Sequence, residues 1–206
     1  MGVIQDKDRR PRDWAYLAEF NQEDLPALQE MVKHINETHD VKTIELFNIN
    51  CERVLHGLDP DIGTPIPIPT RVLKTDDLTT NPGLQQCINI IIGTSSTRWQ
   101  YMGLGSGGTT APTTSQTDLV AAAAGGRIDM AASGRGWREA VGMKLFFGAI
   151  GNELAATFTY TELGVFNSSS GGTMLNRNAF PDNGLTHTIN RSASIISSVI
   201  ELCPVA

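Results

Sequence analysis

Residues 101–112 of this sequence read YMGLGSGGTTAP, and they place Gly103, Gly105 and Gly108 at the spacing G-x-G-x-x-G. In a dinucleotide-binding domain this spacing cradles a pyrophosphate, and a helix begins directly after the glycines. Here the following residues are TTAPTTSQT, and a proline among β-branched threonines disfavours a helix. The stretch therefore predicts a sharp turn at the end of a strand, and we expect no nucleotide and no other cofactor.

From Cys87 onward, short apolar runs such as CINIIIG, RWQYMGLG, GMKLFFGAI and ELAATFTY alternate with turn signals. The dipeptides Gly151–Asn152 and Asn183–Gly184 are typical of two-residue hairpin loops. Many short strands separated by such turns favour an antiparallel arrangement. We therefore predict a mainly β protein whose residues 87–206 form an antiparallel β-sandwich, jelly-roll-like in type.

Residues 1–86 have a different pattern and predict a docking region outside that sandwich. A charged tail over residues 1–13 precedes a segment with helical periodicity, and VKTIELFNINCERV at 41–54 is rich in strand-forming residues. Prolines 60, 65, 67 and 69 then predict an extended arm. The apolar stripe of the predicted helix is the candidate docking surface for a neighbouring protein; the alternative is that it packs on the protein's own sandwich. The stripe consists of Leu25, Leu28, Met31, Val32 and Ile35.

Composition excludes several classes of protein. The net charge is −6, whereas a nucleic-acid-binding domain needs a basic face, so we expect no nucleic-acid partner. The three cysteines form no C-x-x-C motif, which argues against a structural metal site. No apolar run is long enough to cross a bilayer, so we expect no membrane association. The alternative of a local basic patch would consist of Arg127, Arg135 and Arg138.

Catalytic motifs do not point to an enzyme. The sequence has no P-loop and no G-x-S-x-G motif, and His34 and His39 are five residues apart, so they would not share a helix face as zinc ligands do. We expect no catalytic residues and no metal site. An alternative is a pair of carboxylates acting as in a glycosidase. Its candidates are Asp129, Glu139, Glu153 and Glu162.

Three aromatic side chains are candidates for contact with a ligand or a partner. They could stack on a sugar, or they could pack at the edge of a core or at a subunit interface. These residues are Trp99, Tyr101 and Trp137.

Two segments resemble a family of tailed-bacteriophage virion proteins described as tail, fibre or other minor components. The first signature is a strand ending in LG-G-G-TAP, followed by a short TDL helix for which Ser115 and Asp118 provide a capping box. Its matching residues are Gly103, Gly105, Thr110, Ala111, Pro112, Thr117, Asp118 and Leu119. The second signature matches at Glu162, Gly164, Phe166, Asn167, Gly171, Gly172, Met174, Leu175 and Arg177.

This resemblance covers roughly Cys87 to Cys203 and implies a β-sandwich with a structural role. It implies a structural virion protein, made in the host bacterial cytoplasm, that assembles on the capsid, neck or tail through contacts with other virion proteins. Capsid decoration is one such role. We expect a homo-oligomer and favour a trimer. The alternative function is a receptor- or carbohydrate-binding module of a phage fibre.

Overall fold

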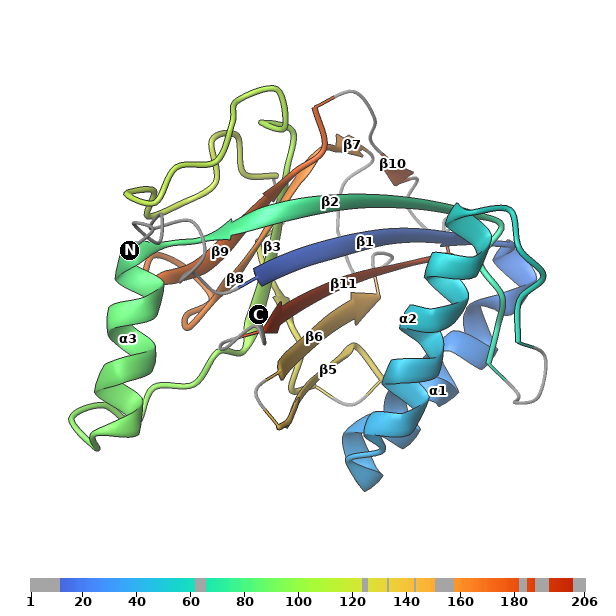
Figure 1. Ribbon diagram of the computed structural model, residues 1–206, viewed down its shortest axis with the longest axis horizontal. Coiled ribbons are helices and arrows are strands. Elements are labelled where there is room, and N and C mark those ends of the chain that lie inside the picture. The colour runs from blue at the N-terminus through green and yellow to red at the C-terminus, as the bar shows by residue number, and fades with distance from the viewer. Residues whose placement is uncertain are drawn as a thin grey trace, which may run out of the picture.

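The computed structural model describes residues 12–61, 66–123, 126–132, 134–142, 144–150, 158–181, 185–187 and 193–201. Its main feature is an antiparallel ladder of nine strands in the order β4-β3-β8-β9-β2-β1-β11-β6-β5, with β7 and β10 forming a separate pair (Figure 1). The strands are β1 (Arg12–Phe20), β2 (Arg71–Thr79), β3 (Tyr101–Gly105), β4 (Ile128–Asp129), β5 (Gly136–Val141), β6 (Lys144–Ile150), β7 (Phe158–Tyr160), β8 (Glu162–Phe166), β9 (Met174–Ala179), β10 (Leu185–His187) and β11 (Ala193–Glu201).

Strand β2 divides this ladder into two sheets. Its residues 71–77 pair with β1, whereas Leu78 and Thr79 pair with β9. Sheet A is therefore β2-β1-β11-β6-β5, and sheet B is β4-β3-β8-β9-β2. One hydrophobic cluster joins Leu17 and Ile196 of sheet A to Met102 and Val165 of sheet B. The prediction of a mainly β, sandwich-like antiparallel fold is confirmed.

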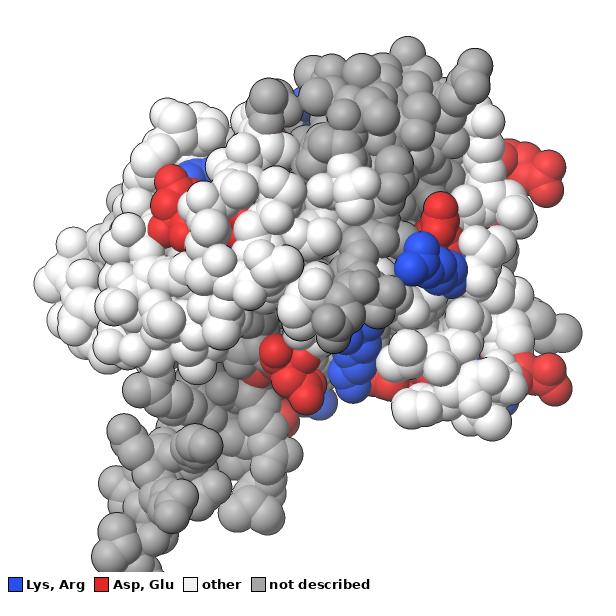
Figure 2. All heavy atoms as spheres, turned by 90° about the horizontal axis from the view of Figure 1, so that it is seen from above, with Lys and Arg blue, Asp and Glu red and all other residues white. Residues whose placement is uncertain are grey.

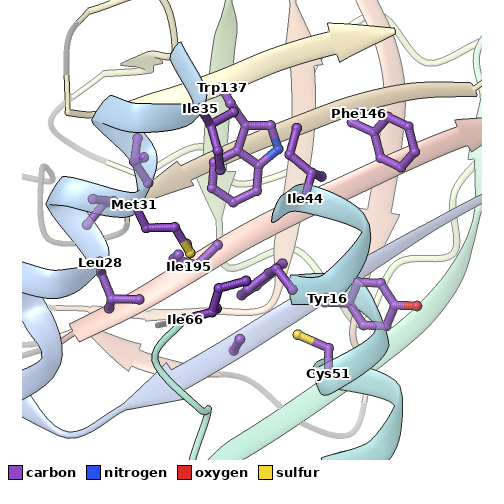
Figure 3. Close-up of a cluster of buried hydrophobic side chains, with 14 of the residues drawn as sticks. Tyr16, Leu28, Met31, Ile35, Ile44, Cys51, Ile66, Trp137, Phe146 and Ile195 are labelled. Atoms are coloured by element: carbon purple, nitrogen blue, oxygen red, sulfur yellow. The ribbon is translucent and has the colours of Figure 1, made fainter. Parts of the chain in front are cut away.

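Two helices cover the other face of sheet A. They are α1 (Leu25–Thr38) and α2 (Val41–Leu55), and a 3₁₀ turn at Gln22–Asp24 leads into α1. Because successive side chains of a strand point to opposite faces, Leu17 lies between the sheets while Tyr16 packs beneath the helices. Figure 3 shows this second core, in which side chains of α1 and α2 meet those of the sheet.

The apolar stripe predicted as a docking surface is part of this core, so the interpretation that favoured a virion neighbour is wrong. Leu28, Val32 and Ile35 have exposed fractions of 0%, Met31 is also buried, and Leu25 packs against the same cluster. Strands β1 and β2 also lie inside the ladder. A domain boundary at residue 87 is wrong for the same reason. A single apolar stripe shows that a helix must pack on something, but it does not identify the surface.

Two further segments that resembled strands are helices because of their N-terminal caps. Helix α2 begins after Asp40, whose side chain accepts hydrogen bonds from the backbone amides of Lys42 and Thr43. Helix α3 (Asn81–Ile91) begins after Thr80, whose Oγ1 accepts from the Gly83 amide at 3.0 Å. These caps satisfy backbone donors that no helical carbonyl can reach. The β-branched composition of both segments is overridden by this local chemistry.

The expected helix at Ser115 is also wrong, since residues 115–123 adopt turns and bends. Asp118 contacts the Arg127 guanidinium at 3.2 Å instead of capping a helix. Of the proline arm, residues 66–69 lead into β2 without regular structure, and residues 62–65 lie outside the described residues. Both expected hairpin dipeptides also lie outside them. Within the ranges given above, no helix is long and apolar enough to cross a membrane.

Buried Asp13 predicts a dependence of stability on pH. The residue is 3% exposed, Thr79 Oγ1 donates to its Oδ2 at 2.8 Å, and its Oδ1 has no hydrogen-bond partner among the described residues. The pKa of Asp13 is raised to about 7, chiefly by burial; the hydrogen bond from Thr79 opposes the rise, and the negative charge of Asp76 adds to it. Because the pKa of Asp13 is higher in the folded state than in the unfolded state, the protonated carboxyl stabilises the fold. This stabilisation is complete at pH values below the unfolded-state pKa and is lost as the pH rises through about 7.

We therefore expect Asp13→Asn to be more stable than the wild type at pH 8, by on the order of 3 kcal/mol, and to differ little at pH 4. The amide is neutral at both pH values and still accepts the hydrogen bond from Thr79. Urea unfolding at a series of pH values measures the effect. Parallel pH profiles for the two proteins would contradict the assignment to Asp13.

Candidate functional site

A fully buried ion pair lies where the two signatures meet. Glu162 begins β8 and Arg177 lies on the neighbouring strand β9. Arg177 Nε donates to Glu162 Oε2 at 2.7 Å, and both side chains have exposed fractions of 0%. A buried charge is tolerated only when its remaining polar atoms are also satisfied. The loop that follows β3, residues 106–123, supplies these partners and is called the glycine loop below.

The carboxylate of Glu162 binds backbone amides at both ends of the glycine loop. Gly107 and Ala121 donate to Oε1 at 3.0 and 2.8 Å, and Val120 donates to Oε2 at 3.2 Å. One carboxylate thus closes the loop by joining residues near its two ends. Hydrogen bonds between backbone amides and a charged oxygen are stronger than those between neutral groups.

The guanidinium of Arg177 holds the first part of the same loop. Its Nη2 donates to the carbonyl of Gly107 at 2.8 Å, and its Nη1 donates to the carbonyl of Thr110 at 2.8 Å. Gln116 Oε1 lies 3.4 Å from Nη1. The planar, multidentate guanidinium suits this set of carbonyl oxygens better than an ammonium group would.

The glycine spacing follows from this close approach. A Cβ on Gly105 would lie 2.4 Å from the carbonyl oxygen of Ala121, and one on Gly108 would lie 2.1 Å from that of Thr161. These distances are too short for any side chain, so the backbones can meet only at glycine. The glycines therefore seat the loop on Glu162. The expectation of no cofactor remains a prediction.

Arg127 connects the glycine loop to the second signature. Its Nη1 donates to the carbonyls of Ser168 and Gly171, at 2.8 and 2.6 Å, and its Nη2 contacts Asp118. The guanidinium carbon lies 3.3 Å from the centre of the Phe166 ring. With its side chain only 10% exposed, Arg127 acts as a clamp between loops. It is therefore unsuited to the basic patch considered above.

The three candidate aromatics do not form a common binding platform. Trp137 has an exposed fraction of 0% beneath the helices, and it packs edge-on against Phe47 with ring centres 5.7 Å apart. The expectation that Trp137 contacts a ligand or partner is therefore wrong. Trp99 is 8% exposed and belongs to the core between the sheets, and Tyr101 is half-buried. Large aromatics in this chain mainly build cores.

The described candidate carboxylates have separate partners. Glu139 contacts His39 at 2.8 Å, Asp129 accepts from Gln100 at 2.9 Å, and Glu162 is buried against Arg177. Glu153 lies outside the described residues. Among the residues with assigned positions, no group of three or more His, Cys, Asp or Glu side chains could hold a metal ion.

The two buried asparagines of β9 did not emerge from the sequence patterns. All six residues of this strand are buried, including Asn176 and Asn178. Asn176 Nδ2 donates to Asn178 Oδ1 at 3.0 Å and to Ser198 Oγ on β11 at 2.9 Å. The available signal was the run NRN within an otherwise apolar segment. Polar side chains in a central strand need buried partners, which the sequence does not name.

The contacts of this centre fix the position of the glycine loop. Its charged groups are buried and bonded to backbone groups of that loop. Neither a protein-family model nor a curated protein matches this sequence. The functional interpretation therefore depends on the signatures and on the surface that the fold presents.

Proposed function

We propose that this chain is a structural virion protein of a tailed bacteriophage that acts by assembly on the capsid, neck or tail. The resemblance supplies the phage context, and its two signatures converge on a buried centre that maintains the fold. A protein of this kind must contact its neighbours through its surface. The observation that carries the proposal is the exposed apolar face of α3.

Helix α3 presents an apolar stripe that nothing in the described structure covers. Leu84, Ile88 and Ile91 follow the spacing i, i+4, i+7, which places them on one side of the helix. Ile88 is 49% exposed, Ile91 is 77% exposed, and the following Ile92 is 64% exposed. A neighbouring side of the helix packs on β9, where Gly83 lies against the backbone of Leu175. Clustered exposed isoleucines are typical of an interaction surface.

The occupant that we propose for this stripe is a second copy of the chain. Residues 78–97 contain no Asp, Glu, Lys, Arg or His, although the whole chain has a net charge of −6. Two identical negatively charged molecules approach most favourably through an uncharged surface. In Figure 2, the end of the molecule that carries the glycine loop also shows mostly uncharged surface. We favour a trimer around α3, which would present the glycine loops together.

Particle composition tests this proposal. In a phage whose genome encodes this chain, quantitative mass spectrometry should find the chain in purified particles at a fixed copy number. Ile91→Lys should reduce its incorporation about tenfold or more, because a charge would be buried in the contact. Leu58→Lys is the matched control, since Leu58 is 56% exposed and lies outside α3. Absence of the chain from particles would refute the proposed function.

A further inference from the structure

Strand β5 leaves one edge of the nine-stranded ladder open. It is the last strand in the order, and Figure 1 shows it at the lower border of the sheet. The Ile150 amide donates to the Arg135 carbonyl at 2.9 Å. In an antiparallel pair, every second residue directs its backbone groups toward the partner strand, so Trp137 and Glu139 of β5 follow Arg135 in facing β6. The backbone groups of Arg138 and Ala140 therefore point away from β6. Within the described ranges, no backbone hydrogen bond is formed by these outward groups.

A groove of about 360 Å³ runs along this edge. The end of α1 borders it through Asn36 and His39, and β5 contributes Arg138, Glu139 and Ala140. Its apolar lining consists of Ile90, Trp99, Leu145 and Phe147. An unpaired strand edge beside an apolar groove has the two elements that strand addition requires, namely a main-chain ladder and pockets for alternate side chains.

The charges in the groove are predominantly positive. The Oε1 atom of Glu139 lies 2.8 Å from Nδ1 of His39. Neither Arg98 nor Arg138 has an ion-pair partner among the described residues. Arg138 is nevertheless half-buried. Because Arg138 pairs in register with Phe147, which lies between the sheets, its side chain lies on the same face of sheet A. Although the chain has a net charge of −6, Arg98 and Arg138 give this groove a local positive charge that suits an acidic group.

We propose that β5 binds an extended segment of a neighbouring virion protein, which adds to sheet A as a further strand. An acidic side chain of that segment lies opposite Arg138 and within reach of Arg98. Its neighbours on the same face are apolar and lie against Trp99 and Ile90. The inference rests on the proposed assembly function and names the kind of partner. Charged residues on an edge strand also oppose indiscriminate pairing, so the arginine selects an acidic strand over others.

The test uses the full chain and the blocked synthetic octapeptide Val-Thr-Val-Thr-Glu-Thr-Val-Thr, whose single glutamate shares one strand face with the valines, with binding measured by calorimetry. We expect Arg138→Glu and Arg98→Glu each to weaken binding about tenfold or more. Lys33→Glu is the control, because it makes the same charge change on the exposed surface of α1 and should change affinity less than about twofold. A peptide N-methylated at alternate residues should bind about tenfold more weakly, because it cannot complete the ladder.

Equal losses in Arg138→Glu and Lys33→Glu would overturn the inference, as would undiminished binding of the N-methylated peptide. Absence of peptide binding, with self-association lost in Arg138→Glu, would assign the edge to a second copy and also overturn it. Arg98 is exposed, so Arg98→Glu remains informative if Arg138→Glu does not fold. Peptide binding by a chain that is absent from particles would refute the virion role while leaving the strand-addition site intact.

Discussion

A chain that begins at Thr80 will not fold, although it retains α3 and every later strand. The deletion removes β1 and β2, which lie in the interior of the ladder. Strand β2 is the strand that sheets A and B share. Nine register pairs between β1 and β11 would be lost, leaving one side of β11 unpaired. The helices that cover the outer face of sheet A would also be missing. Far-ultraviolet circular dichroism should show a largely unstructured fragment with no cooperative thermal transition.

A pair of substitutions in α1 provides the matched control. Val32→Asp places a charge in the core at an exposed fraction of 0%, and should destabilise the protein by about 3 kcal/mol or more. Lys33→Asp changes the neighbouring exposed residue and should cost less than about 0.5 kcal/mol. A cooperative transition in the Thr80 fragment would show instead that the first third of the chain is separable.

The second large effect concerns the buried ion pair. Arg177→Met should destabilise the protein by about 3–5 kcal/mol, because it leaves the Glu162 carboxylate buried without its counter-charge. The carbonyls of Gly107 and Thr110 would lose their donors as well. Urea unfolding measures the loss. Lys33→Met is the control, since its partner Glu30 is 4.0 Å away on the surface, and it should change stability by less than about 0.5 kcal/mol.

The double variant Glu162→Gln with Arg177→Met should be more stable than the sum of the two single losses predicts, because it removes both buried charges. Additive losses, or a loss below about 1 kcal/mol in Arg177→Met, would contradict the view that the pair holds the glycine loop.

Sequence patterns predicted the fold class but not the organisation of the chain. Strand and turn signals after residue 87 depend on local chemistry, and the sandwich-like architecture followed from them. The contribution of β1 depends on pairing with β11, which lies about 180 residues away along the chain. Helices α2 and α3 were misassigned because composition outweighed the caps at Asp40 and Thr80.

For the candidate site, the sequence indicated the residues but not what they do. The glycine spacing predicted a turn, and the two signatures contained both Glu162 and Arg177. Their pairing depends on the register of β8 and β9, in which Gly164 lies opposite Arg177. The tight seating of Gly108 against Thr161 likewise exists only in the folded chain. The sequence left open whether Trp137 packs in a core or contacts a ligand, because aromatic residues suit both cores and surfaces, and burial alone distinguishes them.

Sedimentation velocity of the full chain tests most directly whether it acts by assembly. The subunit mass is 22.3 kDa, and we predict a species of three times that mass at high micromolar concentration. Ile91→Lys should sediment as a monomer, while Leu58→Lys should sediment as the wild type does. A wild-type chain that remains a single 22.3 kDa species at every concentration would contradict self-assembly through α3.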